Sequence, residues 1–110
     1  MPKKSMPAMA VPAGVHDLIM TWGQAVRAHR LLQRLTTAQL ASRVGVSLPT
    51  LSRIEKGDPA VAVGSYLSAL FALGLQSTAT PALPPELWQA PSKQRTRPSR
   101  QESGDDLGYF

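Results

Sequence analysis

The sequence of 110 residues predicts an all-α fold, a bundle of four to five short helices with flexible tails at both ends. Three observations predict it. Apolar residues recur every three to four positions between residues 15 and 74, which is the period of an amphipathic helix. Capping residues and glycines divide this stretch into four segments. The second and third segments are short and are joined by a tight turn, which is the arrangement of a helix-turn-helix unit.

Composition divides the chain into three regions. Residues 1–14 hold three prolines and two lysines, which suits a flexible N-terminal arm. The helical pattern occupies residues 15–80, where we expect the helix-turn-helix domain. Residues 81–110 are rich in proline and in charge, so we expect a largely disordered tail. Within it we expect one docked turn, formed by Leu83, Leu87 and Trp88.

The first helix is expected from about Val15 to Gln33 or Arg34, because apolar side chains follow one of its faces. The inward stripe consists of Val15, Leu18, Ile19, Trp22, Val26 and His29. Thr36 and Gln39 then form a capping-box pattern, which starts a second helix. Its inner face consists of Leu40, Ala41 and Val44, and Gly45 follows where a left-handed residue closes a helix.

The third helix is expected to begin after Ser47, a favourable N-cap, with Pro49 in the first turn, where a missing N–H costs nothing. Residues 57–59, Gly-Asp-Pro, end it. A fourth helix follows from about Val63 to Gly74. We expect it to pack inward through Tyr66, Leu67, Leu70, Phe71 and Leu73. The segment LQSTAT, residues 75–80, is rich in threonine and forms either a short edge strand, which we favour, or an extended exit from the domain.

The third helix separates an apolar side from a polar side. At about 100° per residue, Leu51 and Ile54 lie together, whereas Pro49, Ser52, Arg53 and Lys56 gather opposite them. In a helix-turn-helix unit the second helix enters the DNA major groove. The sequence therefore predicts double-stranded DNA as the partner of this outer side.

Each residue near this side is assigned a DNA contact from its chemistry. An arginine pairs with guanine O6 and N7, a serine donates or accepts, and apolar side chains touch thymine methyl groups. The residues predicted to contact bases are Leu48, Pro49, Ser52 and Arg53. Short hydroxyls and cations suit backbone phosphates, which position a protein without reading sequence. The residues predicted to contact phosphates are Thr37, Arg43, Ser47 and Lys56.

Glu55 falls on the inward side of the third helix, beside Leu51. Because burying an unpaired carboxylate is costly, it needs a cationic partner. Arg30 on the first helix is our choice, and this salt bridge would be structural.

From about Trp22 to Leu75 the chain resembles the Xre/Cro family of helix-turn-helix regulators, through the pieces LTTAQLA, RVGVS, TLSRIEKG and ALFALGL. The resemblance implies a lambda-repressor-like bundle, a DNA-binding transcriptional repressor, and an Arg30–Glu55 pair. Within the family, residues 57–75 with a strand-like continuation resemble HipB-like antitoxins, which repress their own operon and bind a HipA-type kinase toxin. That similarity implies a homodimer in which residues 75–80 supply a pairing strand.

Four residues, at three places in the sequence, depart from the family pattern. Thr37 stands where a phosphate-contacting glutamine is common, and Leu48 and Pro49 replace polar base readers. Arg34 replaces the usual glycine between the first two helices. If this turn is left-handed, the arginine costs about 1 kcal/mol.

Composition argues against several other classes of function. The chain has no cysteine, and its two histidines, His16 and His29, lack a partnering cluster, so we expect no metal site and no cofactor. No serine has a paired histidine and no glycine loop cradles a phosphate, so we expect no enzyme. No apolar run approaches the roughly 18 to 20 residues of a membrane span, and we expect a cytoplasmic protein without a membrane partner.

The net charge of +5 favours a polyanionic partner, although its position matters more than its total. The N-terminal arm and the basic residues between 93 and 100 either follow the DNA backbone or are solvated tails. For the C-terminal run the nearby carboxylates of Glu86, Glu102, Asp105 and Asp106 favour the tail. Two functions stay open: a dimeric repressor of a palindromic operator, and an antitoxin that binds DNA to regulate its own operon.

Overall fold

The computed structural model describes residues 11–90, which form five α-helices and one short 3-10 helix without a strand. The elements are α1 (Ala13–Leu32), α2 (Thr37–Val44), α3 (Leu48–Glu55), α4 (Val63–Ala72), α5 (Gln76–Ala79) and the 3-10 helix η2 (Pro85–Leu87). The expected all-α class is therefore confirmed.

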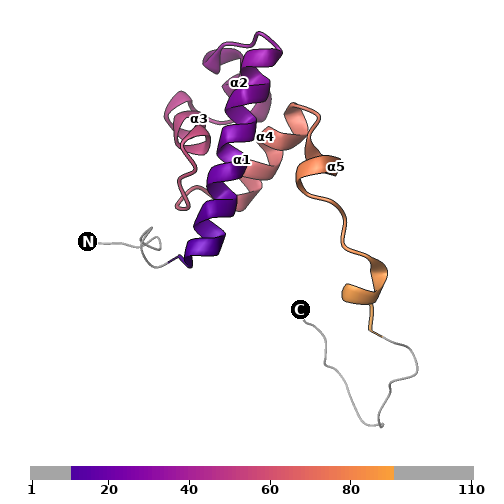
Figure 1. Cartoon of the computed structure of the whole chain (residues 1–110). Helices are drawn as coiled ribbons and strands as arrows, with labels where there is room; N and C mark the ends of the chain where they lie inside the picture. The colour runs from indigo at the N-terminus through magenta and orange to yellow at the C-terminus, as the bar shows by residue number, and fades with distance from the viewer. Residues whose placement is uncertain (1–10, 91–110) are drawn as a thin grey trace.

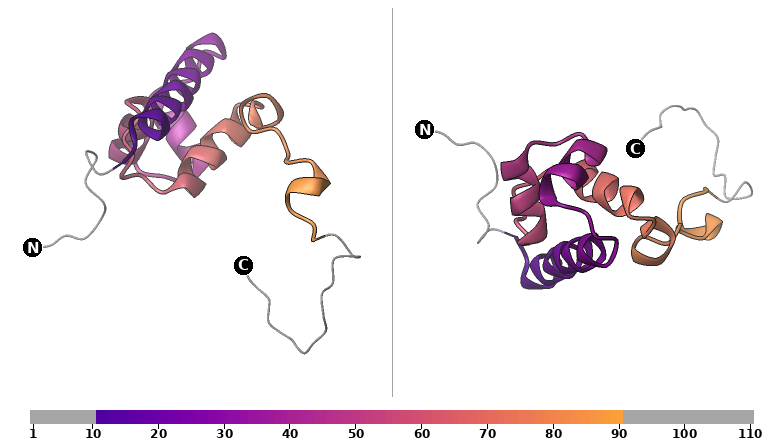
Figure 2. Two further views of the ribbon diagram at one scale, coloured as in Figure 1. Left: turned by 60° about the horizontal axis from the view of Figure 1, so that its bottom comes forward. Right: turned by 90° about the horizontal axis from the view of Figure 1, so that it is seen from above.

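The long helix α1 runs beside the shorter helices of the bundle (Figure 1; Figure 2, right). Both α1 and α2 pack against α3 and α4, and α4 contacts α5. The core is apolar and consists of Val26, Leu40, Ala41, Leu51, Ile54, Tyr66, Ala69, Leu70 and Leu73. It holds α3 against the other helices by one side alone.

The predicted caps of the helix-turn-helix unit are present. Thr36 Oγ1 accepts a hydrogen bond of 3.0 Å from the Gln39 backbone N–H, and Gln39 Oε1 accepts one of 2.8 Å from the Thr36 N–H. Gly45 caps α2 with a φ of 85°. Ser47 Oγ accepts from the Thr50 N–H at 3.2 Å, so α3 begins where the sequence places it. These local signals define both ends of the turn.

A close approach of α1 to the end of α3 was not foreseen from the sequence. A Cβ on Gly23 would lie 2.3 Å from the carbonyl oxygen of Ile54. A Cβ on Gly57 would lie 2.6 Å from the Cα of Met20, and Gly57 also has a φ of 74°. Because real Cβ atoms do not approach so closely, the two glycines let α1 lie directly on the C-terminal end of α3.

The first helix departs from its expected boundaries and face. It begins at Ala13, before the predicted start of the domain, because Pro12 occupies the N-cap position and the His16 N–H donates to its carbonyl. Val15 and Leu18 are exposed, contrary to expectation. With 20 residues α1 is about 30 Å long, against about 12 Å for α3, so its first turns extend past the helices that would cover them.

Two residues of α4 also differ from their predicted position. Leu67 and Phe71 are exposed, whereas Tyr66, Ala69, Leu70 and Leu73 are buried. At 100° per residue, Ala69 and Leu73 shift the inward face of α4 away from Leu67. The two expected core residues therefore lie at the surface beside α2 and α5.

The edge strand predicted for residues 75–80 is wrong, because Gln76–Ala79 form the helix α5. The Ala79 N–H donates to the Leu75 carbonyl and Thr80 Oγ1 donates to the Gln76 carbonyl at 2.7 Å. The described residues offer no second strand for pairing, whereas a helical turn satisfies these backbone groups locally. It also packs Leu75 and Ala79 against the core.

The turn expected after Pro81 forms, but it is not docked. Leu83, Leu87 and Trp88 are all exposed, although η2 and a hydrogen bond from Trp88 Nε1 to the Leu83 carbonyl fix its shape. Residues 91–110 of the predicted tail, and residues 1–10 of the predicted arm, lie outside the described residues.

Candidate nucleic-acid interface

The outer side of α3 is the centre of the candidate interface. Leu51 and Ile54 are 0% exposed and fix the inner side of the helix. Ser52 and Arg53 point away from them and are exposed. Among the described residues, Arg53 has no side-chain hydrogen bond or ion pair, so its guanidinium is free to bind an external acceptor.

The first turn of α3 adds apolar surface to this side. Leu48 and Pro49, predicted to contact bases, are both exposed. Ser47, predicted to contact phosphate, uses its hydroxyl within the cap, since Oγ accepts from the Thr50 N–H and donates to Thr50 Oγ1 at 3.0 Å. Its hydroxyl proton is therefore engaged by Thr50 Oγ1, and a phosphate contact would require this proton to turn away from Thr50 Oγ1, whereas the cap bond from the Thr50 N–H could remain.

A salt bridge fixes the orientation of α3 against α1. Arg30 Nε lies 2.7 Å from Glu55 Oε2, and Arg30 Nη2 donates to Glu55 Oε1 at 3.3 Å. Nη1 of the same arginine donates to the Leu35 carbonyl at 3.0 Å. The two side chains are 10% and 9% exposed, so this two-bond pair is nearly dry. It is the pair expected from the sequence, and it joins α1, α3 and the loop before α2.

A polar hollow of about 410 Å³ lies beside Arg53, between α3 and the start of α4. The loop from Asp58 to Ala62 forms its far wall. Asp58 Oδ1 accepts from the Ala60 N–H at 2.8 Å, and the Asp58 carbonyl accepts from the Tyr66 hydroxyl at 2.7 Å. Burial, and then the negative charge of Asp58, raise the pKa of Tyr66 to about 12. The sequence predicted that residues 57–59 end the third helix, but it did not predict that the loop after them lies beside Arg53.

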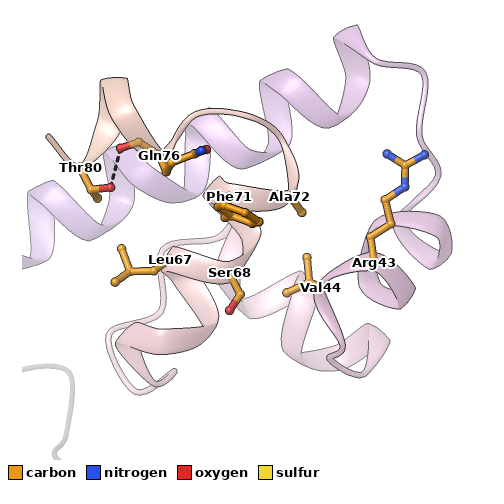
Figure 3. Close-up of a pocket in the computed structure, with 8 residues that line it drawn as sticks. All are labelled: Arg43, Val44, Leu67, Ser68, Phe71, Ala72, Gln76 and Thr80. Carbon is orange, nitrogen blue, oxygen red and sulfur yellow. Dashed lines mark hydrogen bonds between the residues drawn. The ribbon is translucent and has the colours of Figure 1, made fainter. Parts of the chain in front are cut away.

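The remaining predicted phosphate contacts lie in different places. Thr37 is exposed at the start of α2, and Lys56 is exposed at the end of α3. Arg43 does not join the hollow beside Arg53. It lines a separate groove with Leu67 and Phe71 of α4 (Figure 3).

Comparison with known proteins identifies the domain. A family model described as a helix-turn-helix domain matches residues 23–83, just over half of the chain. The match covers the second half of α1, all of α2 to α5, and the approach to η2. No curated protein and no solved structure matches the chain. Within residues 11–90, no helix has both the length and the apolar character needed to cross a membrane.

Proposed function

Because this chain belongs to the helix-turn-helix domain family, we propose that it is a sequence-specific transcriptional repressor that binds a palindromic operator as a homodimer. Family membership makes it a DNA-binding regulator. Repression, the operator symmetry and the contacts of individual residues belong to the proposal. The proposed binding to DNA requires neither catalysis nor a cofactor.

One observation carries the proposal: α3 is anchored on one side and free on the other. Its inner side is held by Leu51, Ile54 and the Arg30–Glu55 pair. Its outer side presents Ser52 and Arg53 to solvent. A rigid helix with a free polar side is what readout in the major groove requires, because the reading side chains must be positioned before they meet the bases.

The residues of the interface divide by the information that they carry. We assign to Arg53 a pair of hydrogen bonds with guanine, worth about 1 to 3 kcal/mol of discrimination against another base. Ser52 accepts or donates beside it, and Leu48 and Pro49 supply contacts to thymine methyl groups. Thr37 and Lys56 hold phosphates, which fixes the register of α3 without reading sequence.

The test measures binding to an operator selected from a random duplex library and to a scrambled duplex of the same length. Arg53→Ala is expected to weaken operator binding by about 10-fold or more and to leave binding to the scrambled duplex nearly unchanged. Lys56→Ala should weaken binding to both duplexes alike and reduce the salt slope by about one. Arg27→Ala is the matched control, because Arg27 is exposed on α1 and has no assigned contact.

Equal loss on both duplexes in the Arg53 variant would remove its reading role. If the selection yields no preferred duplex sequence, the proposal of sequence specificity is wrong.

The antitoxin alternative shares this DNA interface and adds a HipA-type kinase toxin as a partner. The resemblance behind it relied on a strand at residues 75–80, and this segment is helical. Nothing in the described structure favours it over a repressor. A reading frame for a HipA-like kinase beside the gene, together with copurification of its product, would support the alternative.

A further inference from the structure

An apolar groove of about 660 Å³ lies between α2, α4 and α5, apart from the outer side of α3 (Figure 3). Leu67 and Phe71 of α4 face it, and they are 39% and 67% exposed. Arg43 stands at one end and Thr80 at the other (Figure 3). In the described part of the chain Arg43 forms no ion pair. The groove therefore combines unpartnered apolar surface with an unpaired cation.

Residues 83–88, which we call the hook, carry the complementary surface. Leu83, Leu87 and Trp88 are 61%, 66% and 61% exposed. Between them stands Glu86, also exposed. The hook lies away from the helical bundle in each view (Figures 1 and 2). Three large apolar side chains on so short a segment are unusual for a surface that stays in water.

We propose that the hook of one copy binds in the groove of a second copy, and that the reciprocal contact closes a symmetric dimer. The proposal deepens the homodimer of the proposed function by naming the contact that forms it. In such an exchange each copy donates a hook and accepts one, so the interface is used twice and no further surface is left to extend a chain of copies.

The internal bonds of the hook prepare it for burial. Trp88 Nε1 donates to the Leu83 carbonyl at 3.0 Å, so the indole can enter an apolar site without losing a hydrogen bond. The N–H groups of Leu87 and Trp88 donate to the Pro84 and Pro85 carbonyls, at 2.9 and 3.1 Å. Because the shape is already fixed, little conformational entropy remains to be lost on docking.

Charge complementarity favours the groove of this chain as the binding site of the hook. Glu86 is exposed in the hook, next to Leu87 in the sequence, and Arg43 is the cation at the end of the groove. Docking would bring the two together at the edge of a desolvated contact, where an ion pair favours one register. The same chain therefore supplies both the acidic, apolar hook and the basic, apolar groove.

The linker favours the second copy over the hook's own groove. Only three residues, 80–82, join the end of α5 to the hook, and they span at most about 11 Å. One of them is Pro81, and Pro84 at the start of the hook is extended, with a φ of −64° and a ψ of 149°. Since Thr80 itself lines the groove, docking in the same copy would require this stiff linker to reverse its direction at once.

Sedimentation equilibrium of the full chain without DNA tests the proposal. The wild-type protein is expected to be a dimer at micromolar concentration. Trp88→Ala and Phe71→Ala should each weaken dimerisation by about 10-fold or more, because each removes a large side chain from both copies of the contact. Leu32→Ala is the matched control: Leu32 is 73% exposed at the end of α1, outside the groove, and its loss should leave dimerisation unchanged.

Mixing the two variants separates exchange from other modes of association. The Trp88 variant keeps an intact groove and the Phe71 variant keeps an intact hook, so a mixed dimer retains one complete contact. The mixture is expected to dimerise more tightly than either variant alone. A charge reversal gives a second check: Glu86→Arg and Arg43→Glu should each weaken the dimer, and the double variant should recover part of the loss.

Three outcomes would overturn the proposal: a wild-type monomer at about 100 µM, a dimer insensitive to both truncations, or a mixture no tighter than its components. Docking in the same copy has its own signature. In a Trp22→Phe background, the emission of Trp88 would then be blue-shifted at every protein concentration. Exchange between two copies instead predicts a blue shift that grows as the protein concentration rises. Binding to an isolated operator half-site separates the two proposals, because Trp88→Ala should preserve it even where dimerisation is lost.

Discussion

Arg34 occupies the turn between α1 and α2 with a φ of 58°, the left-handed region that non-glycine residues rarely adopt. The cost anticipated for this turn is thus present in the structure. We expect Arg34→Gly to stabilise the domain by up to about 1 kcal/mol, because glycine adopts this conformation without the Cβ clash. Urea unfolding followed by circular dichroism measures the change.

Arg27→Gly is the control for the Arg34 prediction. Arg27 is exposed in the middle of α1, where glycine should destabilise by about 1 kcal/mol. Opposite signs at the two arginines are expected. A destabilised Arg34→Gly protein would mean that the arginine side chain contributes more than its backbone costs.

Tyr66 couples stability to alkaline pH. Its hydroxyl donates to the Asp58 carbonyl, and burial raises its pKa to about 12. Since the ordinary tyrosine pKa is about 10, the folded state holds this proton more tightly than the unfolded state does. The resulting stability is complete below pH 10 and is lost as the pH rises through about 12.

Tyr66→Phe is expected to cost about 1 kcal/mol at neutral pH, since it removes the shorter of the two hydrogen bonds to the Asp58 carbonyl and leaves the one from the Val61 N–H at 3.2 Å. It should also flatten the fall in stability between about pH 10 and 12, because the titrating group is gone. Urea midpoints of both proteins across this range provide the measurement. Parallel pH profiles for the two proteins would contradict the assigned coupling.

The packing of α1 on α3 depends on one position that lacks a side chain. A Cβ on Gly23 would meet the Ile54 carbonyl oxygen at 2.3 Å. Because the Cβ is fixed to one helix backbone and the oxygen belongs to the other, the clash is relieved only if α1 and α3 move apart. We expect Gly23→Ala to destabilise the domain by about 1 to 3 kcal/mol, as overpacking does. It should also weaken operator binding, because Arg53 moves with α3.

Gly64 provides the matched control for Gly23, since a Cβ there would meet nothing within 4 Å. Gly64→Ala lies in α4 and is expected to stabilise by up to about 1 kcal/mol through helix propensity. Thermal unfolding compares the two variants. Similar effects of both substitutions would show that propensity, and not the contact with Ile54, governs the Gly23 position.

Local signals predicted the helices better than they predicted what covers them. The caps at Thr36 and Ser47 depend on atoms within three residues, so the sequence was sufficient to place α2 and α3. The face of α4 depends on which helix lies opposite, so Leu67 and Phe71 were misplaced. The threonines of α5 favoured a strand, but β propensity has little effect without a neighbouring strand.

At the candidate interface the same distinction holds. The outer position of Arg53 follows from helix periodicity and was predictable. The separation of Arg43 from it was not, because it depends on how α2 meets α4. Ser47 was predicted both as a cap and as a phosphate contact, and the cap is present. The phosphate contact stays a prediction, because the hydroxyl proton can turn from Thr50 Oγ1 to a phosphate while Oγ keeps the cap bond.

Charge is distributed unevenly over the whole molecule. Residues 11–90 carry six basic and four acidic side chains, a net charge of +2 out of the total of +5. One of the six, Arg30, is neutralised by Glu55. The described domain therefore offers few cations to phosphates. Its specificity for a DNA sequence must come from the precise placement of α3 more than from its total charge.

The spacing of operator half-sites that the protein accepts depends on the dimer as a whole. A two-fold dimer presents two copies of α3 to one face of the duplex, with half-sites about 34 to 36 Å apart. Inserting five base pairs turns one half-site by about half a helical turn, to the opposite face of the duplex. Only one domain can then bind, and the affinity should fall by about 100-fold or more.

Inserting ten base pairs returns both half-sites to the same face but moves them apart by a further 34 Å or so. A dimer held by hooks on short, proline-containing linkers cannot stretch so far, so binding should stay as weak as with five. Fluorescence anisotropy on three duplexes of equal length, with an isolated half-site as the reference, provides the measurement. Recovery of affinity at ten base pairs would indicate domains on a long flexible connection. Equal affinity for all three duplexes would indicate domains that bind independently. Either result contradicts a rigid two-fold dimer.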